Sequence, residues 1–121
     1  MKARWLALGL TLAATAAVGA NQPLTLKASP AISFAPANLS IRTSVEPDAD
    51  NRSMEVVAES SDFYRSSTVP LDGDRAPKTT QFWFHSVPPG QYEISAVVVA
   101  ADGHRRAVAR TQVTVVDNVG Q

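Results

Sequence analysis

Five aspartates lie in three short turns of the sequence, and clustered carboxylates are ligands that calcium prefers. They are Asp48, Asp50, Asp72, Asp74 and Asp102. Calcium needs about six to eight oxygen ligands, and none of these turns has the D-x-D-x-D-G spacing with a closing glutamate. Aspartate is also common in ordinary turns, and the same turns carry arginines and lysines. Solvated turns with ion pairs are therefore the favoured interpretation, and calcium binding is the alternative.

Trp83 and His85 form a second group with possible binding chemistry. They alternate with two phenylalanines, so they point to the outward side of their predicted strand. We expect Arg42 of a neighbouring strand to lie beside them. An exposed tryptophan next to an arginine can stack on a sugar or anchor a partner protein. We expect instead that the proline-rich N-terminal segment covers the tryptophan, and an exposed binding site is the alternative.

Motifs for catalysis are missing from the sequence. There is no G-x-S-x-G elbow, no H-E-x-x-H pair, no glycine-rich phosphate loop and no cysteine. We therefore expect no enzymatic activity and no cofactor, with a small hydrolase as a remote alternative.

The segments that carry these groups alternate apolar and polar residues with a period of two, which is typical of β-strands. Residues 92–100 and 109–115 alternate in this way on either side of Asp102-Gly103, a strong hairpin signal. Residues 39–45 and 54–59 show the same pattern. The predicted fold is an all-β, antiparallel two-sheet Greek-key sandwich of about seven strands, immunoglobulin-like, in which strands A, B and E face strands C′, C, F and G. The predicted core is Leu39, Ile41, Val45, Met54, Val56, Phe82, Phe84, Val87, Tyr92, Ile94, Ala96, Val98, Val113 and Val115.

The chain begins like a secretory signal peptide. Basic residues precede an apolar run that ends in small residues near Ala20. We expect residues 1–20 to be the signal, 21–37 a proline-rich segment with a broken edge strand, 38–117 the sandwich, and 118–121 a tail. The mature protein would then be periplasmic or extracellular.

The charge balance limits the range of partners. The whole chain has 11 basic and 11 acidic side chains, and the loss of Lys2 and Arg4 with the signal leaves a slight acidic excess. Such a balance argues against nucleic acid as a partner. We also expect no membrane insertion of the mature chain.

The segment Val87-Pro88-Pro89-Gly90-Gln91-Tyr92-Glu93-Ile94 resembles the E–F corner of fibronectin type III and other immunoglobulin-like domains. It is also similar to the matching corner of carboxypeptidase-regulatory-like sandwiches. The resemblance implies that the Tyr92 hydroxyl bonds backbone near Pro88, which gives a buried phenol a partner. It implies no catalytic residue.

The outward side of the second predicted sheet carries valines that could form an interface. They are Val57, Val97, Val99 and Val108, and a homodimer could form through them. The functional hypothesis is an exported, non-catalytic module that binds an envelope or extracellular partner, a protein in preference to a glycan. A structural or accessory subunit of a larger envelope assembly is the alternative.

Overall fold

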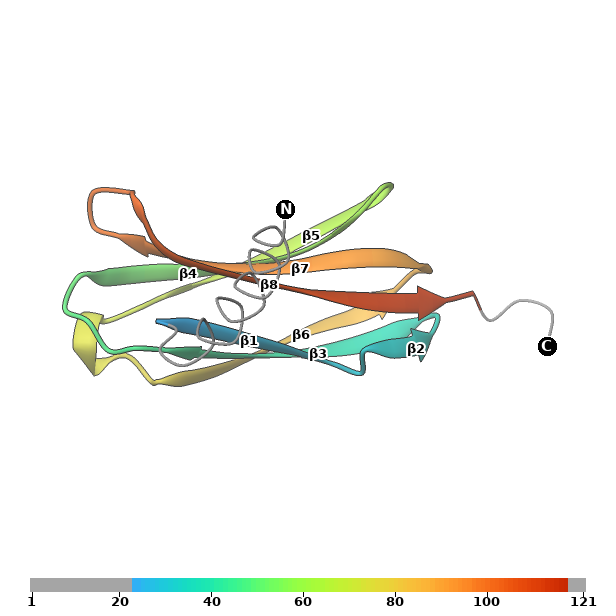
Figure 1. Ribbon diagram of the computed structural model, residues 1–121, viewed down its shortest axis with the longest axis horizontal. Helices are drawn as coiled ribbons and strands as arrows, with labels where there is room; N and C mark the ends of the chain where they lie inside the picture. Colours follow the sequence, from blue (N-terminus) through green and yellow to red (C-terminus); the bar gives the residue numbers. More distant parts are fainter. Residues whose placement is uncertain (1–22, 118–121) are drawn as a thin grey trace, which may run out of the picture.

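A computed structural model describes residues 23–117, which form two β-sheets packed face to face (Figure 1). The predicted signal peptide and the tail lie outside these residues. The smaller sheet has the order β1-β3-β6, and its strands are β1 (Leu24–Ser29), β3 (Ala37–Val45) and β6 (Thr79–Val87). The larger sheet has the order β2-β8-β7-β4-β5, and its strands are β2 (Ile32–Phe34), β8 (Arg105–Val116), β7 (Gly90–Ala100), β4 (Asn51–Ser60) and β5 (Phe63–Pro70). The two sheets are the A-B-E and C′-C-F-G sheets that the sequence predicted, with β2 added to the second.

The core lies between the sheets and follows the predicted alternation. Every residue of the predicted core is buried. The sequence pattern missed Leu24, Ala37, Ala58 and Leu71, which are also in the core. Within residues 23–117, no helix is long and apolar enough to cross a membrane.

The proline-rich N-terminal segment contributes an edge strand to each sheet. β1 pairs antiparallel with β3, and β2 crosses over to pair parallel with β8. Because proline cannot donate a ladder hydrogen bond, such a segment suits sheet edges. β1 therefore lies along β3 on the side away from β6, and β2 lies beside β8. Neither strand covers Trp83, which is 54% exposed. The expectation that the proline-rich segment covers the tryptophan is wrong.

A β-bulge in β6 shifts the pairing of β3 and β6 by one residue, between Leu39 and Ala37. Leu39 pairs with Phe84 and Ala37 pairs with Val87, so His85 and Ser86 together lie opposite Asn38. Ser86 has a φ of 57°, and its N–H donates to the Asn38 side-chain oxygen at 3.2 Å. The extra residue turns Val87 into the core while Trp83 and His85 stay outside.

The corner between β6 and β7 has the geometry that the resemblance implied. The Tyr92 hydroxyl donates to the Pro88 carbonyl at 2.7 Å, and the Tyr92 ring packs edge-on against Phe63. Burial raises the pKa of the Tyr92 phenol. Gly90 has a φ of 155°, and a Cβ there would lie 3.3 Å from the Tyr92 ring, so the corner favours glycine.

Candidate functional site

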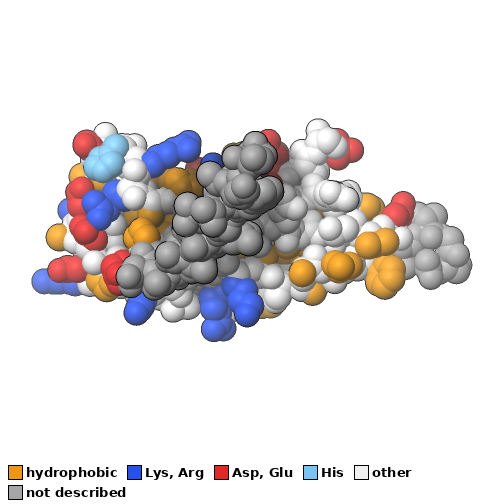
Figure 2. All heavy atoms as spheres, in the orientation of Figure 1, with side chains coloured by type: hydrophobic (Ala, Val, Ile, Leu, Met, Phe, Trp, Pro, Cys, Tyr) orange, Lys and Arg blue, Asp and Glu red, His pale blue; other side chains and the backbone are white. Residues whose placement is uncertain are grey.

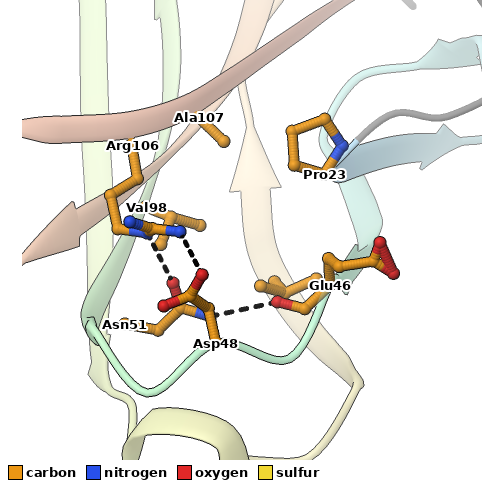
Figure 3. Close-up of a pocket in the computed structure, with 8 residues that line it drawn as sticks. Pro23, Glu46, Asp48, Asn51, Val98, Arg106 and Ala107 are labelled. Atoms are coloured by element: carbon orange, nitrogen blue, oxygen red, sulfur yellow. Dashed lines mark hydrogen bonds and ion pairs between the residues drawn. The ribbon is translucent and has the colours of Figure 1, made fainter.

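The β3–β4, β5–β6 and β7–β8 loops lie at one end of the sandwich (Figure 1). Arg106, the extra residue of a β-bulge at the start of β8, reaches the β3–β4 loop. Its Nη2 donates to Asp48 Oδ2 at 2.5 Å and its Nε donates to Asn51 Oδ1 at 3.1 Å (Figure 3). Asp50 Oδ2 lies 3.7 Å from Arg106 Nη1. One guanidinium therefore neutralises two of the five candidate calcium ligands.

The other three candidate ligands do not join them. Asp102 pairs with His104 within its own turn, and the two hydrogen bonds from His104 lower the pKa of the Asp102 carboxyl. Asp72 and Asp74 lie at a short 3-10 turn, Gly73–Arg75, between β5 and β6. Within residues 23–117 no three metal-ligating side chains come together. The loops converge, but the alternative interpretation of Asp48, Asp50, Asp72, Asp74 and Asp102 as one calcium site has no support in this geometry, because Arg106 and His104 already pair with three of the carboxylates.

A cavity of about 170 Å³ opens beside Arg106. Figure 3 shows Pro23, Glu46, Val98 and Ala107 around it. Asn51 and Glu46 both line the cavity, and the Asn51 side-chain amide donates to the Glu46 backbone carbonyl at 3.1 Å. Its polar lining is thus largely engaged in bonds that join the loops, which is a structural role.

The outer face of the three-stranded sheet has a different composition. We call it the ABE face, and it is made by the outward side chains of β1, β3 and β6: Thr25, Lys27, Ser29, Asn38, Ser40, Arg42, Ser44, Thr79, Gln81, Trp83 and His85. Within residues 23–117, no outward position of these three strands is Asp or Glu. In Figure 2, basic side chains project from the lower edge of the molecule, where Figure 1 has this sheet. The face is hydroxyl-rich and carries positive charge only.

Trp83 and His85 form the aromatic part of the ABE face. Their rings are nearly parallel, at 7°, with centroids 6.1 Å apart. His85 is held at the bulge, where its backbone carbonyl accepts a 2.6 Å bond from the Arg65 guanidinium and its ring nitrogen lies 3.4 Å from Asn38 Oδ1. The two rings are therefore exposed, while the backbone at His85 and Ser86 is hydrogen-bonded to the side chains of Arg65 and Asn38.

The register shows how Arg42 lies relative to Trp83. Ser40 lies directly opposite Trp83, and Arg42 lies opposite Gln81, one step away on the diagonal. On its other side Arg42 lies directly opposite Lys27 of β1. A shallow groove of about 260 Å³ runs between these strands, lined by Lys27, Ser29, Ser40 and Arg42. The sequence prediction missed Lys27, because its place opposite Arg42 depends on the register of β1.

The outer face of the five-stranded sheet, the CFG face, carries the predicted valines. Val57, Val97 and Val99 are half-buried, and Val108 is 37% exposed. Glutamates and arginines are interspersed there, and Arg110 lies 3.9 Å from Glu93. The same face carries large exposed apolar side chains at positions that the sequence analysis did not select: Ile32, Phe34, Tyr64 and Val116. Tyr64 is diagonal to Val57, whereas the other three lie at the far end of β8 from Val108. β2 and the end of β8 supply three of them, and only the cross-over of β2 reveals that Ile32 and Phe34 share a face with the valines.

Comparisons with known proteins bear on the fold alone. No protein-family model and no curated relative matches the sequence. Among solved structures, a superoxide reductase (neelaredoxin) from Ignicoccus hospitalis matches with a TM-score of 0.62 and 16% identity, over 78% of this chain and 80% of that one. A family 76 glycoside hydrolase from a bovine Bacteroides thetaiotaomicron strain matches with a TM-score of 0.57 and 14% identity over 84% of this chain, which spans only 22% of the hydrolase. Fibronectin(III)-like modules from Clostridium thermocellum match with a TM-score of 0.49 and 16% identity, over 78% of this chain and 97% of theirs.

The strand order and the Tyr92 corner define the class. The chain is an immunoglobulin-like, fibronectin type III-like β-sandwich. This fold supports many unrelated roles, so it does not by itself assign one.

Proposed function

We propose that the protein is an exported, non-catalytic recognition module that binds an envelope or extracellular partner through its ABE face. The observation that carries the proposal is the exposed Trp83–His85 pair on the outer face of the three-stranded sheet, 54% exposed at the tryptophan. Exposed tryptophans are enriched at binding hot spots. Export is proposed from the apolar N-terminal stretch of the sequence.

A binding role fits the chemistry of the faces better than catalysis does. His85 has Asn38 and Trp83 as neighbours, and His104 pairs with Asp102 in an exposed turn. Neither arrangement places a serine nucleophile against a histidine base, which a hydrolase of the serine type requires. The remote hydrolase alternative therefore has little support from these residues.

Capture from an envelope extract tests the proposal. The wild-type protein should retain a partner that Trp83→Ala loses. Tyr64→Ala is the matched control, since Tyr64 is 61% exposed but lies on the CFG face, and it should retain the partner. Equal capture by all three proteins would refute a binding role for the ABE face.

The CFG face supports a second candidate, a structural or accessory subunit that assembles through this sheet, including a homodimer. Its support is the group of exposed apolar side chains along β2 and β8, with Ile32 at 70% and Phe34 at 62% exposure. β2 is also an unpaired sheet edge, and such edges can accept another strand. Sedimentation of the wild type and of Phe34→Asp separates the candidates: association that the variant abolishes supports assembly, and a monomer at high concentration refutes the homodimer.

A further inference from the structure

We propose that the ligand of the ABE face is an acidic glycan, whose carboxylates bind Lys27 and Arg42 while a neighbouring sugar ring stacks on Trp83. This inference rests on the proposed function and names its ligand class. It follows from three observations: the unpaired positive charge of the face, the hydroxyl groups of the groove, and the position of the aromatic pair beside it.

Lys27 and Arg42 face each other directly across the β1–β3 pair. Like charges at directly opposed positions destabilise a sheet. Within residues 23–117, the outward positions of β1, β3 and β6 contain no carboxylate that could relieve the repulsion. An anionic ligand would relieve it, and the planar fork of arginine suits a carboxylate well.

The groove between the two cations is lined by hydroxyl groups. Gln81 Nε2 donates to Ser40 Oγ at 2.6 Å. Because the Ser40 oxygen accepts this bond, its own hydrogen can point into the groove and donate to an anion. Ser29, directly opposite Ser40, supplies a second hydroxyl. Two cations and two hydroxyls around one groove match the donor needs of a carboxylate.

Trp83 extends this donor set with a stacking surface. It lies across from Ser40 on the far side of β3, so the groove and the aromatic pair are next to each other along one row of the sheet. Lys27 and Arg42 lie in the next row of outward side chains, together with Gln81. A chain that carries both rings and carboxylates can use both parts at once.

The composition favours a glycan over a protein on this face. Protein interfaces have a core depleted in charge and rich in apolar side chains, whereas here Arg42 lies on the central strand with Lys27 beside it on β1, and Trp83 is the one large apolar side chain among the named positions. A flexible, hydrated ligand leaves these cations in contact with water, so their desolvation cost stays small. The preference for a protein partner that the sequence suggested is therefore not retained for the ABE face.

Binding to polygalacturonate and to its methyl-esterified form tests the inference, because esterification removes the charge and leaves the sugar ring in place. We expect the wild type to bind the acid form and to bind the ester at least ~10-fold more weakly. Lys27→Gln/Arg42→Gln should lose ~10-fold or more on the acid form only, and Trp83→Ala should weaken binding to both forms. Raising the salt from 0.1 to 1 M shortens the Debye screening length from ~10 to ~3 Å. The higher salt should therefore weaken binding of the acid form.

Arg105→Gln/Arg110→Gln is the matched control, since it removes the same charge from the CFG face and should bind like the wild type. Equal binding of acid and ester, or an equal loss in this control, would overturn the inference. Binding of poly-glutamate that depends on Lys27 and Arg42 but not on Trp83 would instead identify an acidic protein segment. If no polyuronate is bound while an envelope partner is still captured through Trp83, the glycan inference fails and the proposed recognition face remains.

Discussion

The ABE and CFG faces share one core and differ in almost every outward residue. The CFG face mixes glutamates with arginines and carries exposed apolar side chains along β2 and β8. The ABE face carries two cations, two aromatic rings, amides and hydroxyls. Since the inward residues alone satisfy the fold, the outward residues of each sheet were free to acquire separate chemistry. The difference is the basis on which we propose solvent-exposed recognition for one face and packing against a protein for the other.

The largest expected effect tests whether the two faces depend on the same core. Phe84 is 3% exposed between the sheets, next to the exposed Trp83. Phe84→Ala should lower the free energy of unfolding by about 3–5 kcal/mol, whereas Trp83→Ala should change it by less than about 0.5 kcal/mol. Urea unfolding of both variants measures the difference. A cost at Trp83 as large as that at Phe84 would mean that Trp83 supports the fold and not a ligand.

Arg106→Ala tests whether the loop end is structural. The substitution removes a donor to Asn51, which is 3% exposed, and a partner of Asp48. We expect a loss of about 2 kcal/mol, because a buried amide oxygen is left without its bond. The neighbouring exposed Arg105→Ala is the control and should cost less than about 0.5 kcal/mol. Thermal unfolding distinguishes them, and similar midpoints would contradict the role of Arg106 in joining the loops.

Much of this organisation follows from period-two alternation. The pattern of residues 92–100 fixed which side chains enter the core, and the Pro-Pro-Gly-Gln-Tyr segment located the corner. The sequence could not show that Arg106 would be the extra residue of a bulge and so reach Asp48, because a bulge changes the register between strands without a distinct sequence signal. The sequence also could not show that Lys27 lies directly opposite Arg42, because the prolines of the N-terminal segment interrupt its alternation of apolar and polar residues.

Tyr92→Phe tests the corner that joins the two sheets. Loss of the bond to the Pro88 carbonyl should cost about 1 kcal/mol at neutral pH. Burial raises the pKa of the folded-state phenol, so its contribution is complete below the unfolded value of about 10 and is lost as the pH rises through the folded value. Urea unfolding from pH 8 to pH 11 should therefore show a steeper alkaline loss for the wild type than for the variant. Parallel curves would refute the burial effect.

The smallest expected effect compares the two faces directly. Each face has one pair of like charges in directly opposed positions, Lys27 with Arg42 and Glu59 with Glu93. Lys27→Gln and Glu59→Gln should each raise the free energy of unfolding, by about 0.2–1 kcal/mol. The gain should be larger at Lys27, because Arg110 already lies 3.9 Å from Glu93, whereas the outward positions of β1, β3 and β6 within the described residues offer Arg42 no carboxylate. Thermal unfolding at low salt measures both gains, and 1 M salt should reduce them. A stabilised Lys27→Gln that also binds polyuronate more weakly would indicate that the repulsion is kept for binding, whereas equal gains on both faces would remove the electrostatic distinction between them.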